Sequence, residues 1–416
     1  MKILHLSYSD TVGGAAIAAS RLHRGLRKKG INSWMMVARK GGQDRYTFSP
    51  NSSLHRIFTL LKPRLDSIPN IIWQTKKGTI WSNNWFPSQL VKEVNKFEAD
   101  IINLHWINND FLDLRSLSQI EAKIVWTMHD AWPITGGCHY PSTCRKYAEH
   151  CQFCPQLKSN FKKDLSYYGF EKKSQVYSQL NMSAVVPSEW LAQAVRISPL
   201  WKNRSVETIA NGLDLNNRKS IDRENARNRL NLPLNKKIIC FGAHNINISR
   251  KGFDLLIKSL KKLRDISNHK ILLTIFGRSK NLNQKEIPYP VKNFGFITNP
   301  RKIDSIYSAS DVFVCPSRED NLPNTVIEAL ANKTPVASFG VGGIPEIIDH
   351  KQNGYIAQKF DIASLTRGIE YCLFHQQLKE KARNKIEENF SMDLQVEKYV
   401  KLYKKLLSET KHNNQQ

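Results

Sequence analysis

A segment with three acidic residues (Glu319, Asp320 and Glu328), PSREDNLPNTVIEALANKTPV at residues 316–336, is the first candidate for a chemical site. The run DVFVCP before it has strand character, and TVIEALAN after it places apolar and small residues at helical spacing. Asp320 lies in the turn between the two, and Glu328 follows inside the predicted helix. A helix N-terminus favours an anion such as a diphosphate, so acids beside it suggest acceptors for neutral hydroxyls. A nucleotide sugar carries both groups; the simpler alternative is that Asp320 only caps the helix.

Two basic residues, Arg250 and Lys251, stand at the start of a second predicted helix, GFDLLIKSLKKLRDIS. A helix N-terminus disfavours cations, so they are either ordinary surface residues or partners of a bound anion. Gly13 and Gly14 follow the first predicted strand and would let the backbone approach a ligand closely. Because the pair is not part of a G-x-G-x-x-G run, it gives no support to a dinucleotide site, and a structural turn is the alternative.

Four of the seven cysteines are clustered in the pattern C-x5-C-x6-C-x2-C: Cys138, Cys144, Cys151 and Cys154. The C-x2-C end has the spacing of a zinc knuckle, and a reducing cytosol disfavours disulfides. The cluster therefore predicts either a structural zinc or unmetallated thiols, and both stay open; His139 and His150 are alternative ligands. An iron–sulfur cluster is less expected. Cys240, Cys315 and Cys372 are expected to be buried small residues.

The predicted elements alternate between strand and helix, which indicates parallel sheets with helical crossovers and hence the α/β class. In the first half we expect strands at residues 2–9, 32–38, 100–106, 123–130 and 183–188, with an Ala-rich helix at 15–30. The pattern then starts again, with strands at 236–244, 270–278, 311–317 and 335–340 and a helix at 252–267. A chain of 416 residues with this repetition fits two domains better than one.

Several runs, taken in order, resemble the family-4 retaining glycosyltransferases of the GT-B fold. They are SDTVGGAAIAASRLHRGLRKKGI, TMHDAWPITGGCHY, ANGLDLN, RKGFDLLIKSL and NKTPVASFGVGGIPEII. The second is similar to a histidine-bearing strand end in bacterial polysaccharide enzymes of this group. The resemblance covers nearly the whole chain and implies two Rossmann-like domains that face each other across a cleft.

The resemblance implies an acceptor-binding domain at residues 1–205 and a nucleotide-sugar donor-binding domain at residues 206–390. The first would carry the cysteine-rich insert 138–154, which is expected to shape the acceptor side. Residues 391–410 are expected to form an amphipathic helix that packs back on the first domain.

The resemblance also implies roles for the candidate residues. Asp320, Lys251 and His129 form the expected catalytic set: Asp320 would hold hexose hydroxyls, Lys251 would clamp the diphosphate, and His129 would contact the sugar without acting as a base. The expected donor-binding residues are Gly13, Gly14, Arg250, Lys251, Leu322, Asn324 and Glu328, with Glu328 on the ribose. The family commonly has an E-x-F-G run where this chain has Asp-Asn-Leu-Pro, and Pro323 cannot donate the amide of a glycine. Leu322 and Asn324 are therefore expected to supply the backbone amides.

The function implied is transfer of a hexose, with retention, from a UDP- or GDP-sugar to a glycan acceptor in cell-surface polysaccharide biosynthesis. We expect the acceptor to be lipid-linked and catalysis to need no cofactor. Two alternatives stay open: a nucleotide-sugar epimerase of the same architecture, and a non-enzymatic polyanion-binding protein.

The net charge of +26, from 62 Lys and Arg against 36 Asp and Glu, predicts an anionic partner. Nucleic acid is not expected, because no nucleic-acid-binding motif is present. The stretch 55–85 mixes Phe58, Leu61, Ile72, Trp73 and Trp81 with Arg56, Lys62, Arg64, Lys76 and Lys77. It predicts either a solvated excursion with its own small core or a surface that binds anionic lipid. With no signal peptide or membrane-spanning run, we expect a cytoplasmic protein, peripheral on the inner face of the cell membrane.

Overall fold

The computed structural model describes residues 1–50, 62, 64–73, 76, 78–218, 221–280 and 282–413, and for residues 410–413 the backbone alone. The chain divides into two compact units, Met1–Ala210 with Asp393–Gln416 (unit 1) and Asn211–Met392 (unit 2). This division falls after the 205/206 boundary expected from the sequence, because strand β7 (Val206–Thr208) pairs with the sheet of unit 1.

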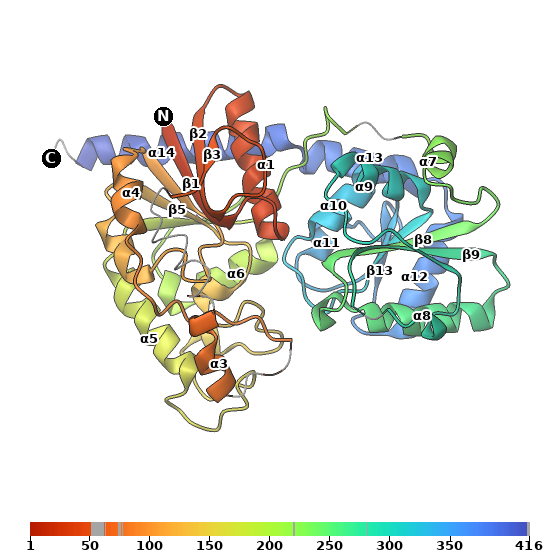
Figure 1. Ribbon diagram of the computed structural model, residues 1–416, viewed down its shortest axis with the longest axis horizontal. Helices are drawn as coiled ribbons and strands as arrows, with labels where there is room; N and C mark the ends of the chain where they lie inside the picture. Colours follow the sequence, from red (N-terminus) through yellow and green to blue (C-terminus); the bar gives the residue numbers. More distant parts are fainter. Residues whose placement is uncertain are drawn as a thin grey trace. The chain divides into compact units, whose positions relative to one another are not determined.

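Unit 1 is built on a parallel sheet with strand order β3-β2-β1-β4-β5-β6-β7 in its described part (Figure 1). Its strands are β1 (Lys2–Ser9), β2 (Asn32–Arg39), β3 (Thr47–Phe48), β4 (Ile101–Leu104), β5 (Lys123–Thr127), β6 (Met182–Val186) and β7. Its helices include α1 (Gly14–Lys28), α3 (Ile68–Ile72), α4 (Leu90–Lys96), α5 (Leu165–Ser178) and α6 (Glu189–Ile197). Short 3₁₀ turns lie at Leu114–Gln119, Trp132–Ile134, Lys146–Ala148 and Pro199–Trp201.

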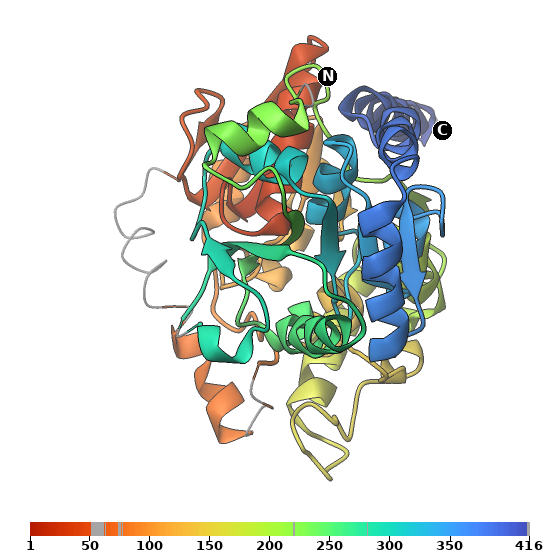
Figure 2. The same ribbon diagram turned by 90° about the vertical axis from the view of Figure 1, so that its right-hand side faces the viewer.

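Unit 2 repeats this plan with a parallel sheet of order β10-β9-β8-β11-β12-β13. Its strands are β8 (Lys237–Asn245), β9 (Ile271–Arg278), β10 (Val291–Asn293), β11 (Val312–Cys315), β12 (Val336–Phe339) and β13 (Gly354–Ala357). Its helices are α7 (Arg223–Arg229), α8 (Phe253–Ile266), α9 (Pro300–Ala309), α10 (Asn324–Ala331), α11 (Ile344–Ile347), α12 (Ile362–Phe374) and α13 (Leu378–Asn389), with 3₁₀ turns at Ser249–Lys251 and Gln284–Glu286. Helices α8 and α12 pack together (Figure 2). Thr366 Oγ1 on α12 donates to the Ser259 carbonyl on α8 at 3.2 Å.

The last helix, α14 (Met392–Asn413), packs on unit 1 through two buried tyrosines. Asn103 Nδ2 donates to the Tyr403 hydroxyl at 2.7 Å, and the hydroxyls of Thr127 and Tyr399 lie 3.0 Å apart. Residue 103 is on β4 and residue 127 ends β5, so α14 lies against the middle of the sheet. None of the described helices is both long and apolar enough to cross a bilayer.

The central strands are apolar and buried on both faces, as crossover helices require. Every residue of β4, β11 and β12 is buried. In unit 1 the core continues into an aromatic cluster of Trp126, Trp132, Tyr177 and Trp201. The predicted α/β class and the two Rossmann-like domains are confirmed.

Candidate functional site

Three loops at the carboxyl end of the second sheet meet around Asp320. They follow β8, β11 and β12, which are neighbouring strands. Gly252, after β8, has a φ of 71°, and a Cβ there would lie 1.8 Å from the carbonyl oxygen of Pro316. Gly342, after β12, has a φ of 59°, and a Cβ there would lie 1.7 Å from the carbonyl oxygen of Asp320. Glycine at both positions is what lets the loops approach this closely.

The carboxylate of Asp320 is held by Lys251 and Arg250, the two basic residues predicted to bind phosphate. Lys251 Nζ lies 2.5 Å and Arg250 Nη1 3.3 Å from Asp320 Oδ2. Asp320 is 7% exposed. Burial opposes its ionisation, but the two cations outweigh burial and hold the pKa of Asp320 below its ordinary value. The Asp320 carboxylate thus offsets the unfavourable placement of two cations at the entrance to α8.

A second ion pair braces the same loops. The Arg318 guanidinium donates to both carboxylate oxygens of Asp254 on α8, at 2.8 and 2.6 Å. The Arg318 amide donates to the Arg250 carbonyl at 2.7 Å, and Arg250 Nη1 donates to the Glu319 carbonyl at 2.7 Å. The hydrogen bond from Arg318 is the main cause that lowers the pKa of Asp254. Sequence reasoning missed this pair, whose members are separated by 64 positions.

Glu328 belongs to a different set of contacts, on α10. It is 7% exposed, and Arg218 Nη1 lies 3.9 Å from its Oε1 and 2.8 Å from Asp304 Oδ1. Burial, and after it the charge of Glu328, raises the pKa of the Tyr307 phenol. Sequence reasoning missed Arg218, whose one signal is its place just after the ANGLDLN run.

Leu322, Pro323 and Asn324 form the entrance to α10. Pro323 is extended, with φ −68° and ψ 118°, and its carbonyl accepts the first helical hydrogen bond, from the Val326 amide at 3.0 Å. Leu322 is buried, and Asn324 is the first helical residue. The predicted donor contacts of the Leu322 and Asn324 amides stay a prediction.

Gly13 and Gly14 begin α1 in unit 1. Gly13 has a φ of 94°, and a Cβ there would meet no atom within 4 Å, so the backbone angle alone requires glycine. Its carbonyl accepts from the Ile17 amide at 3.1 Å. The first turn of α1 carries no acidic residue. A role for this loop in donor binding stays a prediction.

His129 follows β5 in unit 1 and contacts a second histidine. Its Nε2 lies 3.0 Å from His105 Nδ1. Burial lowers the pKa of His129 to about 4, against the opposing charge of Asp130. Asp130 is itself paired with His139, whose Nδ1 lies 2.8 Å from its Oδ2. His129 is therefore neutral at physiological pH.

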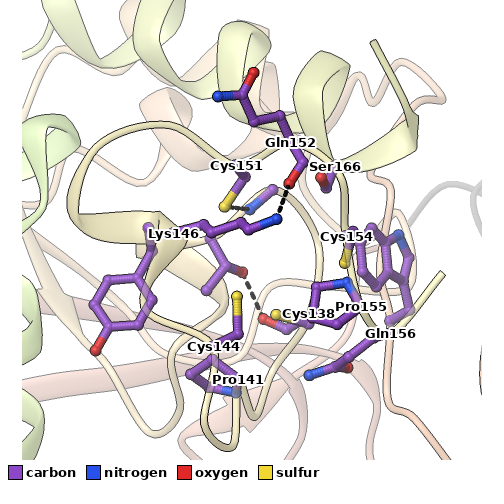
Figure 3. A pocket seen from close by; sticks show the side chains of 14 residues that line it. Cys138, Pro141, Cys144, Lys146, Cys151, Gln152, Cys154, Pro155, Gln156 and Ser166 are labelled. Carbon is purple, nitrogen blue, oxygen red and sulfur yellow. Dashed lines mark hydrogen bonds between the residues drawn. The ribbon is translucent and has the colours of Figure 1, made fainter. Parts of the chain in front are cut away.

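The four clustered cysteines line one small cavity of about 20 Å³ in unit 1 (Figure 3). All four are free thiols, and the Gly136 amide donates to Cys151 Sγ at 3.2 Å. Burial raises the pKa of Cys138, Cys151 and Cys154, that of Cys151 to about 12. Within the described residues, no three His, Cys, Asp or Glu side chains are arranged to hold a metal ion. The zinc site stays a prediction. Cys240, Cys315 and Cys372 are buried, as expected.

The structure thus brings Lys251, Arg250 and Asp320 together in unit 2 and gathers the four thiols in unit 1. Residues 222–390 match the family model described as Glycosyl transferases group 1. This part of unit 2 is a group 1 glycosyltransferase domain. It contains the Asp320 loops and Glu328, whereas Arg218 lies just before the matched range.

Similarity to known proteins extends beyond this domain over nearly the whole chain. WcaC of Escherichia coli (strain K12), named for a glycosyl transferase of colanic acid biosynthesis, is 25% identical over 98% of this chain and 100% of its own length. Anabaena Alr3699/HepE, solved with UDP and glucose, superposes with a TM-score of 0.67 at 16% identity, covering 97% of this chain and 100% of that one. Sucrose-phosphate synthase from Thermosynechococcus elongatus reaches 0.70 at 18% identity, covering 98% and 100%. These likenesses confirm the GT-B fold.

Proposed function

We propose that this chain is a retaining glycosyltransferase that moves a hexose from a UDP- or GDP-sugar to a glycan acceptor in cell-surface polysaccharide biosynthesis. Support for the nucleotide comes from HepE, which shares the fold and was solved with UDP and glucose. Support for the pathway comes from WcaC, which aligns over its full length and is named for colanic acid biosynthesis.

The observation that carries the proposal is the Asp320 cluster at the carboxyl edge of a parallel sheet. Ligands of open α/β sheets bind at this edge. A diphosphate there would compete with the Asp320 carboxylate for Lys251 and Arg250, since phosphate oxygens form strong charge-assisted hydrogen bonds with both cations. Asp320 would then accept hydrogen bonds from hexose hydroxyls.

In the proposed reaction the bond between the anomeric carbon and the phosphate oxygen breaks, and the acceptor oxygen bonds to the same face of the sugar. Lys251 and Arg250 stabilise the negative charge that develops on the leaving nucleotide. The leaving phosphate takes the acceptor proton, so the protein supplies no base. A neutral His129 fits a role in holding the sugar, and Glu328 binds the ribose.

Calorimetric titration of UDP-, GDP- and ADP-sugars tests the donor site. We expect Lys251→Met and Glu328→Gln each to weaken binding about ten- to a hundred-fold, the equivalent of about 1.5–3 kcal/mol for a lost charged hydrogen bond. Lys261→Met is the matched control for Lys251→Met, because Lys261 is an exposed residue of α8, the helix that follows Lys251. Unchanged affinity in both site variants would reject the donor site.

We further propose that the acceptor is lipid-linked and that the protein works at an anionic membrane surface on the cytoplasmic side. Helix α3 and the residues just before it expose Leu65, Ile68, Ile71 and Ile72, with Ile71 74% and Ile72 71% exposed. Arg64 and Lys76 are exposed nearby in the chain. Apolar anchors with basic neighbours are typical of interfacial binding.

The structure corrects one part of the predicted 55–85 surface. Trp81 is not a lipid anchor: it packs with Cys138, Cys154, Leu157 and Leu165 in a small core. Its backbone forms an antiparallel bridge with Cys138. The excursion therefore has its own core as well as an exposed apolar helix. Arg56, Phe58, Leu61 and Lys77 lie outside the described residues.

A further inference from the structure

Three histidines form one hydrogen-bonded row across the first sheet. His5 lies on β1, His105 follows β4 and His129 follows β5, and these three strands are neighbours. His5 Nδ1 lies 2.9 Å from His105 Nε2, and His105 Nδ1 lies 3.0 Å from His129 Nε2. The row runs from His5, which is fully buried, to His129, which is partly exposed. His105 is thus the single link between the two ends.

All three rings are held neutral. Burial is the main cause that lowers the pKa of each, and the neighbouring histidines add to the effect at His5 and His105. A neutral imidazole donates from one nitrogen and accepts at the other. His105 can therefore donate to one neighbour only and must accept from the other. The row as a whole has two arrangements of its protons.

In the outward arrangement, His5 Nδ1 donates to His105 Nε2 and His105 Nδ1 donates to His129 Nε2, so the proton of His129 sits on Nδ1. In the inward arrangement both bonds reverse, and the proton of His129 sits on Nε2. The two differ at the buried end: Nε2 of His5 is a bare lone pair in the first and an N–H in the second. The tautomer of His129 is thereby coupled to that of His5.

The surroundings of His5 favour the outward arrangement. Nε2 of His5 has no hydrogen-bond partner within the described part of the chain. The neighbouring His23 ring meets His5 edge-on, with centroids 5.9 Å apart, and its own Nδ1 lies 2.8 Å from Ser33 Oγ. Proteins tolerate a buried N–H without a partner less well than an unsatisfied acceptor. A bare lone pair on His5 Nε2 therefore costs less than a proton there.

We propose that His105 and His5 are positioning residues that hold His129 as its Nδ1–H tautomer and fix the plane of its ring. This inference rests on the proposed function, in which His129 contacts the transferred sugar. The Nδ1–H of His129 is a donor suited to the oxygen of a sugar hydroxyl. Neutral histidine in water favours the opposite tautomer, with the proton on Nε2, so the row reverses an intrinsic preference and leaves a measurable signature.

Nitrogen NMR of the histidine side chains in the full-length protein reads the tautomer directly. In the wild-type protein we expect Nδ1 of His129 to be protonated and Nε2 to be bare. His105→Phe keeps a ring but removes both hydrogen bonds, and should return His129 to the Nε2–H form. His23→Phe is the matched control, because His23 is equally buried but lies off the row; it should leave the His129 signals in place.

The kinetic consequence separates positioning from simple structural damage. His105→Phe should lower kcat about tenfold with the affinity for the sugar nucleotide nearly unchanged. His105→Gln, which keeps an N–H donor, should restore both the tautomer and most of the rate. His23→Phe should change neither kcat nor the tautomer of His129.

The outcomes also separate this inference from the proposed function. A wild-type His129 protonated on Nε2, or a tautomer that survives His105→Phe, overturns the positioning role even if transfer is observed. If His105→Phe does not fold, the wild-type spectrum alone decides. The predicted tautomer in a protein that transfers no sugar from any nucleotide would support the row and reject the function.

Discussion

At the scale of single residues, the carboxylate of Asp320 is the negative partner of two cations. It pairs with Lys251 and Arg250 across two loops that are 69 positions apart in the chain. A bound diphosphate would take over the cations and leave the carboxylate for hydroxyl groups. The same side chain therefore serves the stability of the domain and, in our proposal, the recognition of the sugar.

The ion pairs of Asp320 predict an acid-dependent loss of stability. Its folded-state pKa is depressed, so its contribution is present above the unfolded pKa of about 3.9 and is lost as the pH falls below it. Asp320→Asn should lower the free energy of unfolding by about 3 kcal/mol at neutral pH, because it removes the negative charge that pairs with both cations. The difference from wild type should narrow below about pH 4. Urea unfolding at a series of pH values measures this.

Asp265→Asn is the control for that series. Asp265 also pairs with an arginine, Arg264 at 3.7 Å, but its side chain is 66% exposed. Exposed pairs contribute little, so this variant should follow the wild type at every pH. A constant gap between Asp320→Asn and the wild type from neutral to acid pH would contradict the linkage to the Asp320 carboxyl.

At the scale of elements, the strands with continuous apolar runs could be predicted from the sequence, because burial on both faces leaves a plain signal. The runs at residues 101–104, 312–315 and 336–339 are of this kind. Sequence reasoning missed β3, β7, β10 and β13. These strands have two to four residues, and all four are at the sheet edges, so they carry little periodicity.

The site could be predicted only where its residues carry a local pattern. Lys251 and Asp320 stand at strand-to-helix turns, and Glu328 lies in the helix that follows Asp320, so the local sequence makes all three candidates. Arg218 and Asp304 had no such pattern, since their contact depends on a packing of segments 86 positions apart. The row of histidines was missed for the same reason: His5 is on β1, whereas His105 and His129 follow β4 and β5, and only the sheet order makes them neighbours.

The cysteine segment predicts a structural zinc. Between Trp132–Ile134 and α5 lie about 30 residues whose one regular element is the turn Lys146–Ala148, and loops of this length are uncommon in compact domains. A zinc held by some of Cys138, Cys144, Cys151 and Cys154 would brace this loop, with the Gly136 amide already donating to one sulfur. Binding would require the thiols to turn toward one centre. We expect about one zinc per chain by elemental analysis of untagged protein.

Cys138→Ala should remove the metal and lower the melting temperature, whereas Cys240→Ala should keep the metal, because Cys240 is buried in the sheet of unit 2. A metal-free protein whose melting is unaffected by added zinc or by chelators would leave the unmetallated thiols as the correct alternative.

The exposed apolar residues of helix α3, Ile68, Ile71 and Ile72, predict reversible membrane binding. We expect the protein to cosediment with vesicles that contain anionic lipid and to be released by salt, since each basic residue near such a surface contributes about 1 kcal/mol. Replacing Ile71 and Ile72 together by serine should reduce binding about tenfold or more. Ile197→Ser is the control, as Ile197 is 52% exposed on a different helix, α6. Equal binding to neutral and anionic vesicles would contradict the role of the basic residues, and no binding even at low salt would favour a soluble acceptor.

At the scale of the whole molecule, the chain combines two parallel sheets of similar plan that carry different chemistry. Unit 2 supplies the cations and acids suited to a nucleotide sugar. Unit 1 supplies the histidine row, the cysteine segment and the exposed apolar helix. Helix α14 is last in the chain but packs on the first sheet, so unit 1 is complete only when unit 2 has been made.

The central claim is hexose transfer with retention, and a product assay tests it most directly. Purified protein is incubated with an isotopically labelled UDP- or GDP-hexose and a lipid-linked glycan acceptor, and NMR of the product reads its anomeric configuration. We predict label in the acceptor, in the same anomeric configuration as in the donor, and a rate that falls at least tenfold in Lys251→Met but not in Lys261→Met. An epimerised sugar nucleotide formed without acceptor, or a product of inverted configuration, would contradict the account.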